Sequence, residues 1–182
     1  MDSSSGLSYI LLVVLVALSA FFSASETALN SINKIRMKNM ADNGDQRAAK
    51  TLEVAEKYES MISTILIGNN IVNIGSASIA TTLFTIWLGA DKGAAISTVV
   101  MTIVVLIFGE VLPKNYAKAN ADSLAMTVAG PISVLMVIFK PLSAVLNFLS
   151  GIMTKLTGGK EDKPSVTEEE LKYLVESIEE EG

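Results

Sequence analysis

Three long apolar runs constrain this chain more than any other feature of its sequence. They cover approximately residues 7–30, 61–88 and 94–113, and each is long enough to cross a lipid bilayer as an α-helix. Half of the 182 residues are hydrophobic and only 18% are charged, as is typical of an integral membrane protein. The sequence therefore predicts an all-α membrane protein with three transmembrane helices.

The composition excludes several kinds of chemistry. The chain has no cysteine and no histidine, so disulfides, thiolate or imidazole metal ligands, cysteine nucleophiles and Ser-His-Asp catalysis are ruled out. No pairing of a serine with a lysine can be placed at one membrane depth, so we do not expect an enzyme. The net charge of −5 comes largely from the C-terminal segment and argues against a nucleic-acid partner.

The distribution of lysine and arginine predicts the orientation. Residues 34–57 form a basic segment with a turn at Asn43-Gly44 between two amphipathic helices, and the positive-inside rule places this segment in the cytoplasm. The N-terminus has no basic residue, unlike a cleaved signal peptide, and is predicted to lie outside the cell. We therefore expect a multi-pass protein of the plasma membrane with its C-terminus in the cytoplasm.

Residues 130–156 leave two interpretations open. The stretch is apolar enough for a fourth span, but Lys140-Pro141 lies at its middle, where a lysine would be costly in hydrocarbon. We favour a kinked helix or helical hairpin at the cytoplasmic interface. Such a juxtamembrane helix would complete a transmembrane domain of residues 1–157.

Residues 158–182 are predicted to form a polar linker and an acidic cytosolic helix. Thr167 and Glu170 match a capping box, and apolar residues follow at helical spacing. Such a helix has nothing within this chain to pack on, so we expect it to lead into a further soluble domain.

The third apolar run ends in the sequence GEVLPK, residues 109–114, which we interpret as half of a cation site. A carboxylate beside hydrocarbon is costly, so Glu110 is a functional candidate. In a regular helix the amide of residue 113 would donate to the carbonyl of Gly109, but proline has no N–H. We therefore expect a helix break at Gly109 and Pro113 that frees this carbonyl. The simpler alternative is that Glu110 lies at the water interface and Pro113 merely ends the helix.

The other two runs supply polar side chains that would complete the site. Ser19 and Ser23 share one face of the first run, and Asn69 and Asn73 share one face of the second. Hydroxyl, amide, main-chain and carboxylate oxygens suit a hard cation such as Mg2+, Ca2+ or Na+. Each pair alone is also explained by ordinary hydrogen bonds of membrane helices, so the prediction depends on the three runs meeting. Glu26, on the same face as the serines, either adds a second negative charge or caps the adjacent cytoplasmic region.

Together these patterns resemble the transmembrane domain of the CorB/CorC and cyclin M (CNNM) magnesium transporters. The resemblance is carried by the sequences SAFFSASETALN (19–30), GNNIVN (68–73) and GEVLPK (109–114), and it covers nearly the whole chain. It implies a homodimer of three-span protomers with a belt-like juxtamembrane helix, exporting Mg2+ with coupling to Na+ entry. It also implies a nearly dehydrated ion held by Ser19, Ser23, Asn69, Asn73, Gly109 and Glu110. Which of Asn69, Asn70 and Asn73 binds the ion directly is left open.

The resemblance also bears on nucleotides and on the choice of function. Members of the family bind ATP and Mg2+ in cytosolic CBS domains, which this sequence does not contain, so no nucleotide site is assigned here. Our leading hypothesis is a Mg2+ transporter domain in which movement around Gly109 and Pro113 gives alternating access. The alternative is a non-transporting membrane adaptor or sensor of Mg2+ that acts through cytosolic domains and binds the ion without flux.

Overall fold

A computed structural model describes residues 3–156, and this part of the chain is helical almost throughout, with no β-strand. In chain order the helices are α1 (Ser3–Asn30), α2 (Lys34–Asp42), α3 (Gln46–Glu56), α4 (Tyr58–Leu88), α5 (Ala90–Val104), η1 (Val105–Val111), α6 (Leu112–Ala119), α7 (Ala121–Ile138) and α8 (Lys140–Leu156). The predicted all-α class is confirmed.

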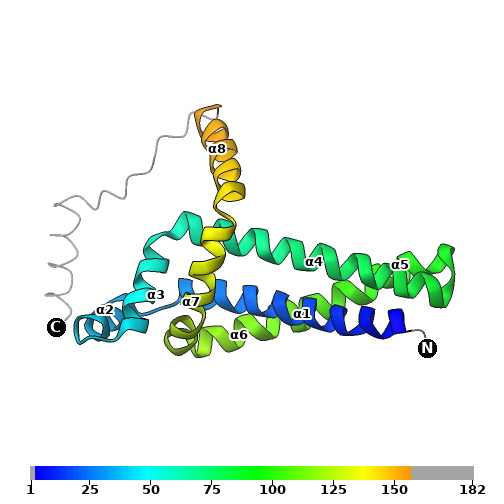
Figure 1. Cartoon of the computed structure of the whole chain (residues 1–182), viewed down its shortest axis with the longest axis horizontal. Helices are drawn as coiled ribbons and strands as arrows, with labels where there is room; N and C mark the ends of the chain where they lie inside the picture. The colour runs from blue at the N-terminus through cyan, green and yellow to red at the C-terminus, as the bar shows by residue number, and fades with distance from the viewer. Residues whose placement is uncertain (1–2, 157–182) are drawn as a thin grey trace, which may run out of the picture. The chain divides into compact units, whose positions relative to one another are not determined.

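Three long helical segments form an apolar bundle (Figure 1). They are α1, α4 and the uninterrupted helix made of α5, η1 and α6, which continues from Ala90 to Ala119. Each is long and apolar enough to cross a membrane, as expected from the three apolar runs. Large apolar side chains such as Val13, Ile74 and Ile103 are exposed on them, which suits contact with lipid. The chain is therefore a multi-pass membrane protein.

Helices α1 and α4 run antiparallel, and close contacts fix their register. From one end of the pair to the other, Tyr9 meets Trp87, Leu15 meets the position of Gly75, and Phe22 meets Gly68. A Cβ atom at Gly68 would overlap the Phe22 ring, so glycine at this position lets the two helices approach closely. Phe22 and Gly68 are both buried there.

A tight connection joins α4 to α5. Gly89 has a φ of +84°, a conformation that favours glycine, and its N–H donates to the Thr85 carbonyl at 3.0 Å. One turn later, a Cβ atom at Gly93 would lie 2.5 Å from Thr85 Cα. The main chains of α4 and α5 therefore touch, which brings the second and third spans together directly after the turn.

The basic segment folds into α2 and α3, as the sequence predicts, at the opposite end of the bundle from the α4–α5 turn (Figure 1). The Asn33 side chain caps α2 by accepting from the Arg36 N–H, and Asp45 caps α3 by accepting from the Arg47 and Ala48 N–H groups. Met37 of α2 and Val54 of α3 enter a buried core that α7 completes.

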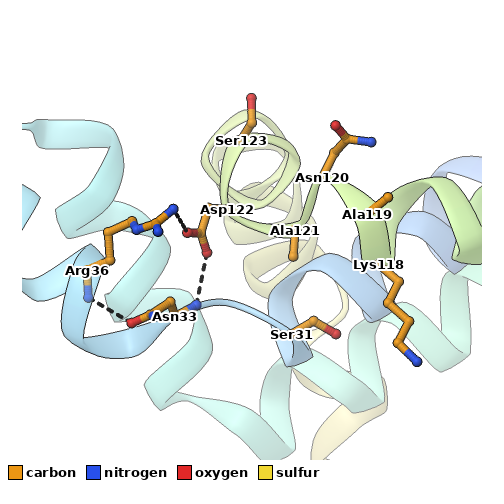
Figure 2. A pocket seen from close by; sticks show the side chains of 9 residues that line it. All are labelled: Ser31, Asn33, Arg36, Lys118, Ala119, Asn120, Ala121, Asp122 and Ser123. Carbon is orange, nitrogen blue, oxygen red and sulfur yellow. Dashed lines mark hydrogen bonds and ion pairs between the residues drawn. The ribbon is translucent and has the colours of Figure 1, made fainter.

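Asp122 ties the start of α7 to α2 (Figure 2). One carboxylate oxygen accepts from the Asn33 N–H at 2.9 Å, and the other lies 3.2 Å from Arg36 Nη1. A hollow of about 380 Å³ adjoins this pair and is lined mainly by polar residues of the α1–α2 and α6–α7 connections. These contacts fix α7 against the basic segment.

Helix α7 crosses the ends of α1 and α4 instead of lying alongside them (Figure 1), and it contacts α1, α3 and α4. It begins at Ala121, earlier than the predicted start near residue 130. It is interrupted at Phe139, beside the Lys140-Pro141 pair at which a kink was predicted, and α8 follows. By length and composition alone α7 also qualifies as a candidate span.

The chain divides into two compact units after Ala144. The first contains the bundle, the basic segment, α7 and the start of α8. In the second unit, the described residues continue α8 and expose apolar side chains such as Phe148 and Met153. The linker and acidic helix predicted for residues 158–182 lie outside the described residues.

Candidate cation site at the junction of three helices

The centre of the candidate site is a contact between α1 and α4. The Ser19 hydroxyl donates a hydrogen bond of 3.1 Å to Oδ1 of Asn69. Ser19 is 1% exposed, so this pair is shielded inside the bundle. The antiparallel register of the two helices brings these residues to one level. The sequence predicted that polar residues of the first two apolar runs meet, and Ser19 and Asn69 do so.

The third span reaches the same point through Gly109. This residue is buried in η1, and a Cβ atom built on it would lie 2.8 Å from Ser19 Oγ. Any larger residue would therefore press on the serine. Ser19, Asn69 and Gly109 thus bring a hydroxyl, an amide and the main chain of three helices together.

The helix is not interrupted at Gly109 and Pro113, where a break was predicted. The chain stays helical, but Val105–Val111 is a π-helix, and the Leu112 N–H donates to the Ile107 carbonyl five residues back. Helix α6 then resumes the α-helical spacing with Pro113 in its first turn. Because proline has no N–H, Pro113 donates to neither the Phe108 carbonyl nor the Gly109 carbonyl. The helix therefore continues through the predicted break, and the role of the Gly109 carbonyl as a ligand stays a prediction.

Ser23 and Asn73 extend the polar surface in opposite directions. Ser23 lies four residues after Ser19 in α1, and Asn73 lies four residues after Asn69 in α4. Because α1 and α4 are antiparallel, these two steps lead in opposite directions. At 1.5 Å per residue the two positions are separated by about 12 Å along the bundle. They therefore flank the central contact and do not meet around a single point.

Both flanking residues have a polar atom in need of a partner. Ser23 Oγ and Asn73 Oδ1 are buried and make no hydrogen bond among the described residues. Leaving such an oxygen unpaired inside a protein is costly. Their oxygen atoms are therefore available to an ion or to water entering the bundle on either side of Ser19.

Glu110 carries the only carboxylate of the predicted ligand set. It follows Gly109 in η1, is half-buried, and forms no hydrogen bond or ion pair with the side chains that the structure describes. Over the same range, no three acidic side chains gather into a metal-binding group. A cation here would be held mainly by neutral oxygens and one negative charge.

The sequence left the role of Glu26 open, and in the structure Glu26 forms an ion pair with Lys114. Its Oε2 atom lies 3.2 Å from Nζ of Lys114, and both side chains are about two-fifths exposed. Lys114 lies four residues after Glu110, yet it pairs with Glu26. The ion pair joins α1 to α6 on the Ser23 side of the junction and leaves the Glu110 carboxylate free.

Sequence reasoning missed Lys114 and Phe22 as parts of this region. Lys114 was considered only as the last residue of the GEVLPK sequence. Phe22 was not considered separately, although its ring packs on Gly68 beside Asn69. The adjacent Gly68-Asn69 pair was the available signal, because a glycine at a helix crossing commonly faces a large side chain of the partner helix.

This arrangement of apolar spans around a shielded polar junction defines a multi-pass membrane domain. The family model for the cyclin M transmembrane N-terminal domain matches residues 10–182. The chain belongs to this family, as its three sequence patterns suggested.

Several curated proteins are similar over most of the chain. A UPF0053 protein of Haemophilus influenzae is 36% identical over 169 residues, which are 92% of this chain and 40% of the relative. The inner membrane protein YfjD of Escherichia coli, of the same UPF0053 group, is 37% identical over 87% of this chain and 37% of its own length. A polyamine export protein of H. influenzae is 25% identical over 94% of this chain and 43% of its own length. The chain therefore spans about two-fifths of the length of these relatives.

Proposed function

We propose that this domain exports Mg2+ across the plasma membrane, with Na+ entry as the driving reaction. The observation that carries the proposal is the buried contact of Ser19, Asn69 and Gly109, which Glu110 directly follows in the chain without a hydrogen-bond or ion-pair partner among the described residues. A hard cation would satisfy these oxygens together, and the three helices that supply them all belong to the membrane bundle. The family resemblance supports Mg2+ as the cargo and Na+ as the coupling ion.

The charge of the site suits transport better than storage. A single carboxylate leaves a divalent cation incompletely neutralised, and Mg2+ gives up its water ligands reluctantly. Binding at Glu110 is therefore expected to be weak. A weakly held ion can be released on the far side of the membrane.

The order of the polar groups along the bundle supports a path for the ion. Ser23 lies on the side of α2 and α3, Asn73 lies on the side of the α4–α5 turn, and the Ser19–Asn69 contact lies between them. We propose that the ion exchanges water for Ser23 on one side and for Asn73 on the other. Movement of η1 around Gly109 and Pro113 would then open the two sides alternately.

The orientation and the assembly belong to the same proposal. We place α2 and α3 in the cytoplasm, because they carry the basic segment, and the N-terminus outside. We also retain α7 and α8 as a juxtamembrane region at the interface, since α7 crosses the bundle ends and Lys140 interrupts the apolar stretch (Figure 1). A homodimer is proposed from the family resemblance, and no nucleotide site is proposed for this chain.

The direct test is Mg2+ efflux from proteoliposomes that contain the protein in its longest natural form. Glu110→Gln keeps the shape of the side chain and removes its charge, and it should reduce efflux at least about tenfold, the effect of about 1.4 kcal/mol. Glu56→Gln, at an exposed acid of α3, is the matched control and should leave efflux unchanged. Wild-type efflux in Glu110→Gln contradicts the proposal, and dependence of the rate on a Na+ gradient tests the coupling.

The same proteoliposome experiment distinguishes Mg2+ export from two other functions. A sensor or adaptor would bind Mg2+ saturably without moving it, so binding without efflux favours that alternative. The name of the H. influenzae relative points to a polyamine as another cationic cargo. Efflux of spermidine that is faster than Mg2+ efflux, and equally sensitive to Glu110→Gln, would reassign the cargo while retaining the site.

A further inference from the structure

A second polar hollow lies away from the bundle junction, between α3, the start of α4 and the end of α7. Its volume is about 420 Å³. The lining combines three lysines and one glutamate with two serines and three apolar residues: Lys50, Lys57, Lys140, Glu53, Ser60, Ser133, Val54, Met136 and Val137. The charged side chains sum to two net positive charges, which favours an anionic ligand.

Glu53 holds two of the lysines in place. Its carboxylate oxygens lie 2.9 Å from Lys50 Nζ and 2.7 Å from Lys57 Nζ. Each ammonium group has three N–H donors and uses one of them here, so both can still donate to a ligand. Lys140, from the start of α8, is exposed and forms no ion pair with the described residues.

The beginning of α4 adds to the positive character of this hollow. Ser60 lies in the first turn of α4, and the first helical N–H groups have no acceptor within their own helix. The hydroxyls of Ser60 and Ser133 provide further donors. Oxygens of a phosphate group would satisfy lysines, hydroxyls and free amides at once.

The surroundings favour a lipid as the source of that phosphate. Val134, Val137 and Ile138 of α7 are 60%, 72% and 58% exposed, and they continue the apolar surface next to the lysines. Tyr58, at the start of a long apolar helix, is 56% exposed, as is typical of aromatic residues at the membrane interface. An anionic headgroup could therefore lie in the hollow while its acyl chains lie along α7.

The hollow beside Asp122 is a weaker candidate. There Arg36 is already paired with Asp122, and the Lys118 side chain points away from that pair (Figure 2). The residues that line that hollow are polar apart from two alanines.

We infer that Lys50, Lys57 and Lys140 form a binding site for the phosphate group of an anionic phospholipid. The site would anchor α3 and α7 to the membrane surface. It is independent of the cation site, because it shares no residue with the junction around Ser19.

The test is retention of phosphatidylglycerol, compared with phosphatidylcholine, by the purified protein in native mass spectrometry. Lys140→Gln leaves the Glu53 ion pairs intact and should weaken phosphatidylglycerol binding about fivefold, while the triple variant Lys50→Gln, Lys57→Gln, Lys140→Gln should abolish the preference for this lipid. The control Lys34→Gln, Lys38→Gln, Lys92→Gln removes the same charge from exposed lysines elsewhere and should keep the preference. Circular dichroism checks that all variants remain helical.

Two results would overturn the inference. Equal retention of phosphatidylglycerol by the hollow and control triple variants would show that the lysines of the hollow form no specific site. Displacement of the lipid from the wild-type protein by excess inorganic phosphate would assign the hollow to a free phosphate anion and not to a lipid. Resistance to phosphate, together with loss of lipid in the hollow variants alone, is the result we expect.

Discussion

Gly109 of η1 faces Ser19 of α1 so closely that a Cβ atom on the glycine would lie 2.8 Å from the serine Oγ. Because Ser19 donates to Asn69 of α4, this approach connects all three spans through one hydroxyl. A side chain at residue 109 would have to displace the group that joins α1 to α4.

The first prediction follows from this approach. Gly109→Ala should reduce Mg2+ efflux about tenfold or more, because overpacking at a tight contact costs about 1–3 kcal/mol and would fall on Ser19. Gly130→Ala is the matched control, since a Cβ atom there meets nothing within 4 Å. Efflux measured in proteoliposomes should separate the two alanines, and equal rates would mean that the approach of Gly109 to Ser19 has no role in transport.

Gly93 gives a prediction about stability. Gly93→Ala places a Cβ atom 2.5 Å from Thr85 Cα and 2.6 Å from Thr85 N, so the backbones of α4 and α5 must separate. We expect a loss of about 1–3 kcal/mol in the free energy of unfolding, with a lower thermal midpoint in detergent. Gly130→Ala again serves as the reference, and an unchanged midpoint in Gly93→Ala would contradict the close packing of the two helices.

The Glu26–Lys114 ion pair predicts different effects on Mg2+ binding when each of its two members is substituted. Glu26→Gln frees Lys114 to approach Glu110, four residues away, and should weaken Mg2+ binding about twofold, in keeping with the small worth of exposed ion pairs. Lys114→Gln removes the competing cation and should not weaken binding. Mg2+ titrations of both variants provide the measurement. Weaker binding in Lys114→Gln than in Glu26→Gln would show that the ion pair does not keep Lys114 away from Glu110.

Glu53 predicts a pH dependence outside the membrane-spanning helices. Its hydrogen bonds to Lys57 and then to Lys50, with their charges, lower the pKa of this carboxyl from 4.5 to about 2. A lowered folded-state pKa stabilises the fold above about pH 4.5, and this stabilisation is lost as the pH falls toward 2. Carboxyl chemical shifts in an NMR titration should follow Glu53 directly, and Lys57→Gln should move its midpoint upward. A midpoint near 4.5 in the wild-type protein would rule out these ion pairs in solution.

The convergence of Ser19, Asn69 and Gly109 could be predicted because periodicity places each residue on one face of its helix. The short connection at Gly89 then makes the second and third spans antiparallel neighbours. The wider set is less compact than the sequence suggested. Ser23 and Asn73 are each one turn from the central pair, and their separation follows from the direction of the helices, which spacing within one helix does not reveal.

Other features had no adequate signal in the sequence. A π-helix inserts one residue into a turn without altering the apolar character of the run, so Val105–Val111 was expected to be α-helical up to a break. Helix α7 begins at Ala121, but the prediction started near residue 130, within the apolar stretch, and so missed the first turns. Hydropathy also carries no information on the direction of α7 across the bundle.

The most direct test of the central claim is Mg2+ binding to Glu110, followed by magnesium-NMR line broadening in the purified protein. The wild-type protein and Glu56→Gln should both broaden the Mg2+ signal saturably, and Glu110→Gln should lose this effect at the same protein concentration. Broadening of wild-type strength in Glu110→Gln would contradict the account, because the ion would then be held without the one carboxylate placed beside Gly109.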